Sequence, residues 1–386
     1  MEQGIAPTSE RSSGIPWYAW TSAIAVTSIA AGLYWDISWH MSIGRDTFWT
    51  PAHLAIHFGA MVAVTSAIYL ILTTTFGKNQ AARESSVRLW GFRGPLGTFV
   101  SLWGGLAMLT SAPFDDWWHS AFGLDVQIIS PPHMVLGAGI FVLGFGGLIL
   151  IAALMNRAQG EHRNRLNYAF LYVGCLLLVI HMMLIMEYTD HTLMHSGIFY
   201  RTVALGIPMI LVGLARASGY RWACTMAAGM YTALWLAAEW LVPLVPAEPK
   251  LGPVNTRITH LVPLGFPLLV IAGALAMDVL LNRLSVRPKW LQAAVVGGGF
   301  LAAMIVAQWP MGSLLVSPRA ENWIFGTDYY PYMLSPQFYK QYAHQFHVYE
   351  KTWEIFWLNL AIGLVAAIVS ARIGLMWGQW MRELRR

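Results

Sequence analysis

Ten long apolar runs, separated by polar connections that are short except for the last, restrict this chain to a membrane fold. A helix must offer roughly 20 apolar residues to cross about 30 Å of hydrocarbon. Charged residues make up only 11% of the chain, against about 25% in a typical soluble domain. We therefore expect an all-α fold, a polytopic transmembrane helical bundle of about ten spans. The predicted spans are residues 16–38, 51–76, 95–115, 131–156, 167–189, 197–216, 221–245, 260–282, 289–309 and 352–378.

The Lys and Arg residues are unevenly divided between the two sides of such a bundle. The tails and the connections after even-numbered runs hold 17 of the 24, and the other connections hold the remaining 7. Because cytoplasmic connections carry the excess of Lys and Arg, we predict cytoplasmic N- and C-termini. The opposite face is then the periplasmic one, if the protein lies in the inner membrane of a bacterial cell. The lipid bilayer is its expected surrounding partner.

Several other classes of protein do not fit the sequence. The basic residues form short clusters between apolar runs, so no nucleic-acid surface is expected. The two cysteines, Cys175 and Cys224, lie inside apolar runs, which argues against a Cys-rich zinc site or a disulfide scaffold. The N-terminus lacks a basic region and a small-residue cleavage site, so we predict that the first run is retained as a helix. The sequence is compatible with a homo-oligomer but does not indicate one.

Histidines gather on the predicted outer side of the membrane. His57 lies one turn further in, His181 falls in the outer half of the fifth run, and only His162 is expected in the cytoplasm. Ionisable groups at membrane depth are costly and usually functional, although polar residues also decorate connections without a specific role. Nine of the twelve lie at or beyond the outer ends of the spans: His40, His53, His119, His133, His191, His195, His260, His344 and His347.

An internal repeat organises the first of these histidines. The pattern Asp-x3-His-x3-Gly-x-Asp, followed by Pro-x-His, occurs twice. An Asp and a His four residues apart share one face of a helix, and the Pro is tolerated in the first turn of the next helix. One carboxylate and two imidazoles can then converge on copper, iron, zinc or manganese. The candidate metal ligands are Asp36, His40 and His53 in the first copy, and Asp115, His119 and His133 in the second.

Further polar residues stand near the repeat and near the later outer connections. His57 and the Arg45–Asp46 pair are candidates for orienting the first ligand set, and the pair could equally be a surface ion pair. Met182, Met183 and Met186 follow His181 and are more typical of apolar filling than of copper ligation. The remaining candidates could form a second site, a proton path or helix-end caps: Glu187, Asp190, His191, His195, Glu239, His260, His344 and His347.

The segment from Asp36 to His53, DISWHMSIGRDTFWTPAH, resembles the C subunit of copper membrane monooxygenases, the particulate methane and ammonia monooxygenases. It shares Asp-x3-His-x12-His with Trp-His-Met, Arg-Asp-Thr and Thr-Pro-x-His inside it. The resemblance implies copper ligation by Asp36, His40 and His53. The family's second site pairs an Asn with a His four residues later. Asp115 and His119 look like that pair, with Asp in place of Asn.

This resemblance covers roughly residues 15–155 and suggests two regions. Residues 1–156 would be a four-helix region like the monooxygenase subunit, and residues 157–386 would add six helices and a long outer loop, 310–351. The resemblance implies a copper-dependent, monooxygenase-like oxidoreductase subunit, with copper as cofactor and iron or zinc as alternatives. A periplasmic cupredoxin-like protein or other membrane subunits would be its partners. Copper transport or delivery is one alternative function, and a proton-conducting or structural subunit without metal is another. The sequence assigns no catalytic residue.

Overall fold

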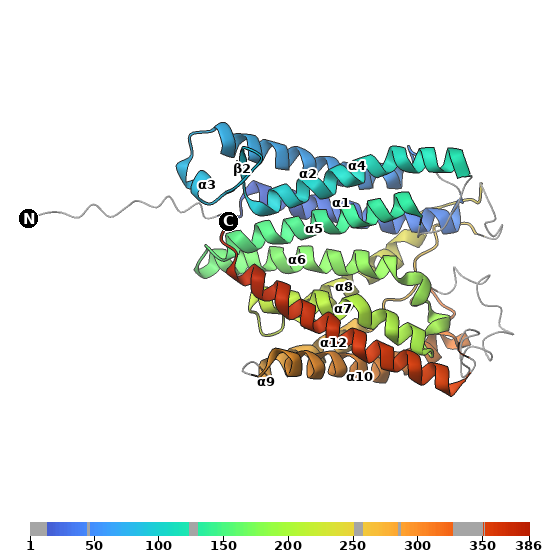
Figure 1. Cartoon of the computed structure of the whole chain (residues 1–386). Helices are drawn as coiled ribbons and strands as arrows, with labels where there is room; N and C mark the ends of the chain where they lie inside the picture. Colours follow the sequence, from blue (N-terminus) through green and yellow to red (C-terminus); the bar gives the residue numbers. More distant parts are fainter. Residues whose placement is uncertain are drawn as a thin grey trace, which may run out of the picture.

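The computed structural model describes residues 14–44, 47–122, 130–250, 258–284, 287–326, 350 and 352–386, which form a bundle of helices (Figure 1). The long helices are α1 Trp17–Ser42, α2 Pro51–Phe76, α4 Leu96–Phe122, α5 Pro131–Met155, α6 Gly160–Leu184, α7 Gly197–Ser218, α8 Ala223–Leu241, α9 Val270–Arg283, α10 Lys289–Leu315 and α12 Trp353–Glu383. The short elements are α3 Gln80–Glu84, the antiparallel strands β1 Val87–Leu89 and β2 Phe92–Gly94, and the 3-10 turns η1 Met186–Tyr188, η2 His191–Leu193, η3 Val242–Leu244 and η4 Pro318–Ala320.

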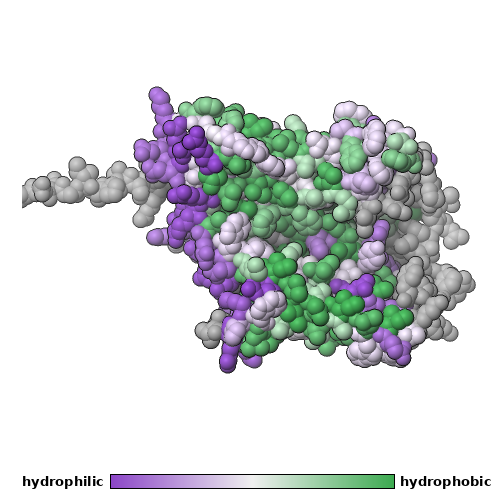
Figure 2. All heavy atoms as spheres, viewed as in Figure 1, coloured by the Kyte–Doolittle hydropathy of each residue, from purple (hydrophilic) through white to green (hydrophobic). Residues whose placement is uncertain are grey.

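Six of the described helices are long and apolar enough to cross a membrane: α2, α5, α6, α7, α10 and α12. Figure 2 shows an apolar band across the middle of the visible face and hydrophilic residues gathered at one end. These features indicate an integral membrane protein. The predicted all-α bundle is confirmed in this form, and the count of ten spans stays a prediction.

The two ends of the bundle differ in what they carry. Helix α1 begins and α12 ends at the same end, the hydrophilic one in the view of Figures 1 and 2. The C-terminal end of α1 and the N-terminal end of α2, which carry the first Asp-His motif, lie at the opposite end (Figure 1). Both ends of the helical core therefore lie away from the motifs. The assignment of these two faces to cytoplasm and periplasm stays a prediction.

The predicted span 260–282 is helical only in its second part. Helix α9 starts at Val270, and His260 instead forms an isolated bridge with Pro246. Pro263 and Pro267 cannot donate backbone hydrogen bonds, and Gly265 adopts a positive φ of 94°. The sequence 260–269 therefore continues as irregular chain. The predicted loop 310–351 also changes at its start, because α10 runs on to Leu315 with Pro310 inside the helix.

Side chains of neighbouring helices satisfy the backbone of the irregular segment 258–269. Ser38 Oγ donates to the Val262 carbonyl at 2.6 Å, and the Val262 amide donates to Ser42 Oγ at 2.7 Å. The Leu264 amide donates to the Tyr34 hydroxyl at 3.1 Å. Non-helical backbone survives at membrane depth only where protein supplies such partners. Three side chains of α1 thus hold this segment against the bundle.

Helices α1 and α2 touch backbone to backbone just below the first motif. A Cβ atom at Gly32 would lie 2.9 Å from the Ile56 amide nitrogen and 3.0 Å from the Ala52 carbonyl oxygen. Small residues allow this close approach of membrane helices. Asp36 lies one turn after Gly32, and His53 follows Ala52, so the contact sets the separation of these two side chains. The regions before and after residue 156 also share one hydrophobic core, in which α6 packs against α5 and α1.

The close contact at Gly32 predicts a penalty for a single methyl group. Gly32→Ala should lower the free energy of unfolding by about 1–3 kcal/mol, the usual cost of overpacking. The measurement is thermal unfolding of the purified chain in detergent micelles. Gly137→Ala is the matched control, because a Cβ atom at this position of α5 has no other atom within 4 Å. Equal unfolding temperatures for the two variants would contradict the prediction.

Candidate metal centre

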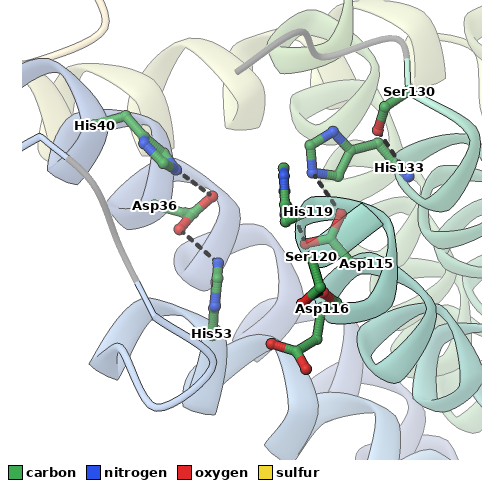
Figure 3. Close-up of polar contacts among 9 residues, drawn as sticks. All are labelled: Asp36, His40, His53, Asp115, Asp116, His119, Ser120, Ser130 and His133. Carbon is green, nitrogen blue, oxygen red and sulfur yellow. Dashed lines mark hydrogen bonds and ion pairs between the residues drawn. The ribbon is translucent and has the colours of Figure 1, made fainter. Parts of the chain in front are cut away.

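The first motif forms a cluster between the end of α1 and the start of α2 (Figure 3). Asp36 and His40 lie one turn apart on α1, with His40 Nε2 3.9 Å from Asp36 Oδ2. His53 approaches from the first turn of α2, and its Nε2 lies 3.2 Å from Asp36 Oδ1. The two imidazoles therefore lie at different oxygens of one carboxylate. We call these three residues the first cluster.

The second motif repeats this arrangement at the end of α4 and the start of α5 (Figure 3). His119 Nε2 lies 3.5 Å from Asp115 Oδ2, and His133 Nε2 lies 3.6 Å from Asp115 Oδ1. We call Asp115, His119 and His133 the second cluster. Asp116, the next residue along α4, is exposed and belongs to neither set of contacts.

Local sequence explains why both clusters form in the same way. The helices α1 and α4 continue past the predicted ends of the spans, so the Asp and the His four residues later share a face. Pro51 and Pro131 each occupy the first position of the next helix, where their missing amide hydrogen costs nothing. A histidine two residues later then returns to the carboxylate.

Among the described residues, the same carboxylate oxygen lacks a hydrogen bond in both clusters. Asp36 Oδ1 and Asp115 Oδ1 are both buried and accept no hydrogen bond of good geometry from the described residues. Buried acceptors without a partner are rare. Each of these oxygens faces the second histidine of its motif. An anionic oxygen of this kind, beside two imidazoles, suits a cation.

The side chains lie in pairwise Asp–His contacts and not in a coordination sphere. Within the described ranges, no three His, Cys, Asp or Glu side chains are placed to hold a metal ion. Two ligand atoms at about 2.1 Å from one ion are about 3.0–3.4 Å apart, as bond lengths of this size require. The shorter contact in each cluster, at 3.2 and 3.5 Å, is close to that range. The donors are assembled, and ligation would require the imidazoles to turn.

Other predicted residues near the first cluster have separate surroundings. The ring of His57 stacks on Phe48 at a centroid distance of 5.3 Å and lies edge-on to His53 at 6.4 Å. Its Nδ1 is buried and has no hydrogen-bond partner among the described residues. His57 therefore supports the His53 ring by packing. Arg45 and Asp46 lie outside the described residues.

The predicted echo at the end of the fifth span has a different geometry. Helix α6 ends at Leu184, so Glu187 and His191 do not share a helix face, and Glu187 is exposed. His191 pairs instead with its neighbour Asp190, Nδ1 to Oδ2 at 3.1 Å. Burial alone would lower the pKa of His191, but the Asp190 carboxylate overcomes this effect and raises it. Burial would raise the pKa of Asp190, and His191 with the Thr192 hydrogen bonds lowers it instead.

His195 has a structural position between two segments. It is buried, and its Nε2 lies 3.1 Å from the Trp309 carbonyl oxygen and 2.9 Å from Ser313 Oγ of α10. These contacts attach the turn before α7 to α10.

The later candidates are spread over other parts of the structure. Glu239 is buried at the end of α8, where Tyr34 donates to its Oε2 at 3.5 Å. His260 Nδ1 lies 2.9 Å from Thr259 Oγ1, a contact within its own segment. His344 and His347 lie outside the described residues. The structure thus brings together the two Asp-His-His sets and the Asp190–His191 pair, and it leaves these remaining candidates apart from them.

Comparison of the chain with protein-family models, with curated proteins and with solved structures gives no match. The similarity to the C subunit of copper membrane monooxygenases therefore rests on the residues of the two motifs and stays a prediction. The geometry of the clusters is an observation independent of it.

The position of His195 predicts a stability effect. His195→Ala removes the two contacts that join this turn to α10, each worth about 0.5–1.5 kcal/mol, so the free energy of unfolding should fall by about 1–3 kcal/mol. Thermal unfolding in detergent measures this, with Glu187→Ala as an exposed control in the same connection between α6 and α7. Wild-type stability of His195→Ala would show that the two contacts do not hold this turn to α10.

Proposed function

We propose that this chain is an integral membrane copper-binding protein in which the first and second clusters are the metal sites. The observation that carries the proposal is the repeated placement of one carboxylate between two imidazoles, at contacts of 3.2 to 3.9 Å. Helix geometry and an N-terminal proline produce this set twice from separate parts of the chain. Two independent copies of one donor set argue for a ligand and against chance pairing.

The donor set fits copper by its chemistry. Imidazole nitrogen suits copper, zinc and iron, and a carboxylate adds a harder, charged ligand. The buried Oδ1 atoms of Asp36 and Asp115 lack hydrogen bonds among the described residues, so a cation would satisfy both. Because Asp115 stands where the similar family has Asn, both clusters offer one negative charge to the ion. Iron and zinc remain the alternative metals.

The proposed activity is that of a copper-dependent monooxygenase-like oxidoreductase subunit. Bound copper supplies one-electron chemistry with dioxygen. The chain's own residues would hold the ion, balance its charge through the carboxylate and fix it at one end of the helical bundle. We place that end at the periplasmic face of an inner membrane, where a cupredoxin-like protein or other membrane subunits could reach it. The similarity of the Asp36–His53 segment supports the proposed activity. The excess of Lys and Arg predicted for the other side of the membrane supports the proposed orientation.

A metal analysis with matched variants tests this proposal. Asp36→Asn removes the charge of the first cluster with little change in shape, and should weaken copper binding there by at least about tenfold, the loss typical even of residues that only orient a ligand. Asp116→Asn is the control, because it removes an exposed carboxylate from the end of α4 that contacts neither cluster. The measurement is copper per chain after purification without chelators, followed by titration.

X-ray absorption at the copper edge provides the second part of this test. Nitrogen and oxygen ligation that diminishes in Asp36→Asn and persists in Asp116→Asn is the expected result. Equal copper content in the two variants would refute the assignment of the first cluster. A metal-free protein that takes up no copper on titration would favour the proton-conducting or structural alternative.

A further inference from the structure

A cavity lies inside the bundle, apart from both clusters. A cavity of about 100 Å³ opens between α1, α6, α8, the turn from 185 to 196 and the irregular segment 258–269. Four methionines from separate segments line it: Met41, Met182, Met186 and Met194. The same wall contains the Asp190–His191 pair. Thioethers and an imidazole thus border one cavity.

The methionines are not explained by the filling of gaps. Methionine is flexible and commonly closes irregular spaces in a core. Here these side chains border a space that stays open. Met183 shows the contrast, because it lies next to Met182 on α6, is equally buried and does not line the cavity.

His191 is held in an orientation that suits metal ligation. Its Nδ1 lies 3.1 Å from Asp190 Oδ2, and Asp190 Oδ1 accepts hydrogen bonds from the Thr192 amide at 2.9 Å and from the Thr192 hydroxyl at 2.7 Å. The carboxylate is therefore fixed and accepts a hydrogen bond from Nδ1–H. Metal-binding histidines are typically held by a carboxylate in this way. Among the described residues, no hydrogen bond engages Nε2.

The sulfur atoms divide into two kinds. Met194 Sδ accepts a hydrogen bond from Gln308 Nε2 at 3.1 Å, and Gln308 Oε1 accepts from the Leu269 amide at 2.8 Å. That thioether therefore belongs to the buried polar contacts that support segment 258–269. Met182 and Met186 lie four residues apart in the chain, at the end of α6 and in η1. With Met194 engaged by Gln308, they are the other methionines of the cavity that lie nearest to His191 in the chain.

We propose that this cavity binds Cu(I) through Met182, Met186 and His191. Soft thioether ligands select Cu(I), and imidazole suits copper as well. Two thioethers and an imidazole that binds in its neutral form would hold the ion, and the Asp190 carboxylate behind His191 would balance its single positive charge. The site deepens the proposed copper function, but none of its ligands belongs to the first or second cluster. Helix α1 links the two regions, because His40 belongs to the first cluster and the adjacent Met41 lines the cavity.

Anaerobic Cu(I) titration of the full chain in detergent micelles, in competition with a chromophoric Cu(I) chelator, tests the site. Met182→Leu/Met186→Leu keeps the volume of the side chains and removes both thioethers. The affinity of the chain for one of its bound Cu(I) ions should fall by at least about tenfold in this double variant. Met183→Leu is the matched control on the same helix and should bind as the wild type does. Equal Cu(I) affinity of the double variant and the wild type would overturn the proposal.

X-ray absorption of the Cu(I)-loaded chain gives an independent measurement. Copper–sulfur scattering should be present in the wild type and in Met183→Leu, and absent from Met182→Leu/Met186→Leu. Its absence from the wild type would also overturn the site.

The variant Asp36→Asn/Asp115→Asn separates the two proposals. It should keep the Cu(I) equivalent and its sulfur scattering even if both clusters lose their copper. Failure of the clusters and failure of the cavity are therefore distinguishable results.

Discussion

Backbone polar groups within an apolar bundle must find partners inside the protein, and the structure depends on how this requirement is met. Helices satisfy it almost everywhere. One exception among the described residues is segment 258–269, where the prolines and Gly265 interrupt the helix and Tyr34, Ser38 and Ser42 of α1 supply partners. Helix α1 is therefore anchored on one side by these hydrogen bonds and on another by the Gly32 contact with α2. The first cluster stands on this anchored helix.

The helices were largely predictable from apolar runs, but their ends were not. The runs 16–38 and 95–115 stop before His40 and His119, because hydropathy falls where Trp, His and Asp begin. The helices α1 and α4 continue to Ser42 and Phe122. Backbone hydrogen bonding, not apolarity, decides where a helix ends. The predicted span 260–282 is helical only from Val270 onward, and here apolarity overestimates the helix. It is apolar enough, but its partners lie more than two hundred residues away on α1, which no local pattern shows.

The same division between local and distant information applies to the sites. Both clusters follow from local rules, namely the four-residue spacing on one helix and the proline that starts the next. The prediction that Glu187 and His191 lie close together assumed that the helix continues to His191. Helix α6 instead ends at Leu184. Met41 and Met194 have no local signal at all, since they reach the cavity from α1 and from the turn before α7. Sequence spacing therefore found the repeated clusters, and only the assembled bundle reveals the cavity.

The double anchoring of α1 has a consequence for how quickly the first cluster can respond to a ligand. A helix held on two sides cannot roll or slide without breaking hydrogen bonds to segment 258–269 or opening the Gly32 contact. The remaining freedom lies in the χ angles of Asp36, His40 and His53. Rotamer changes of side chains occur in picoseconds to nanoseconds, whereas helix shifts take microseconds or longer. The backbone of the first cluster is thus held in place while its side chains can change rotamer quickly. We therefore expect that rearrangement of these ligands does not limit the rate of metal binding.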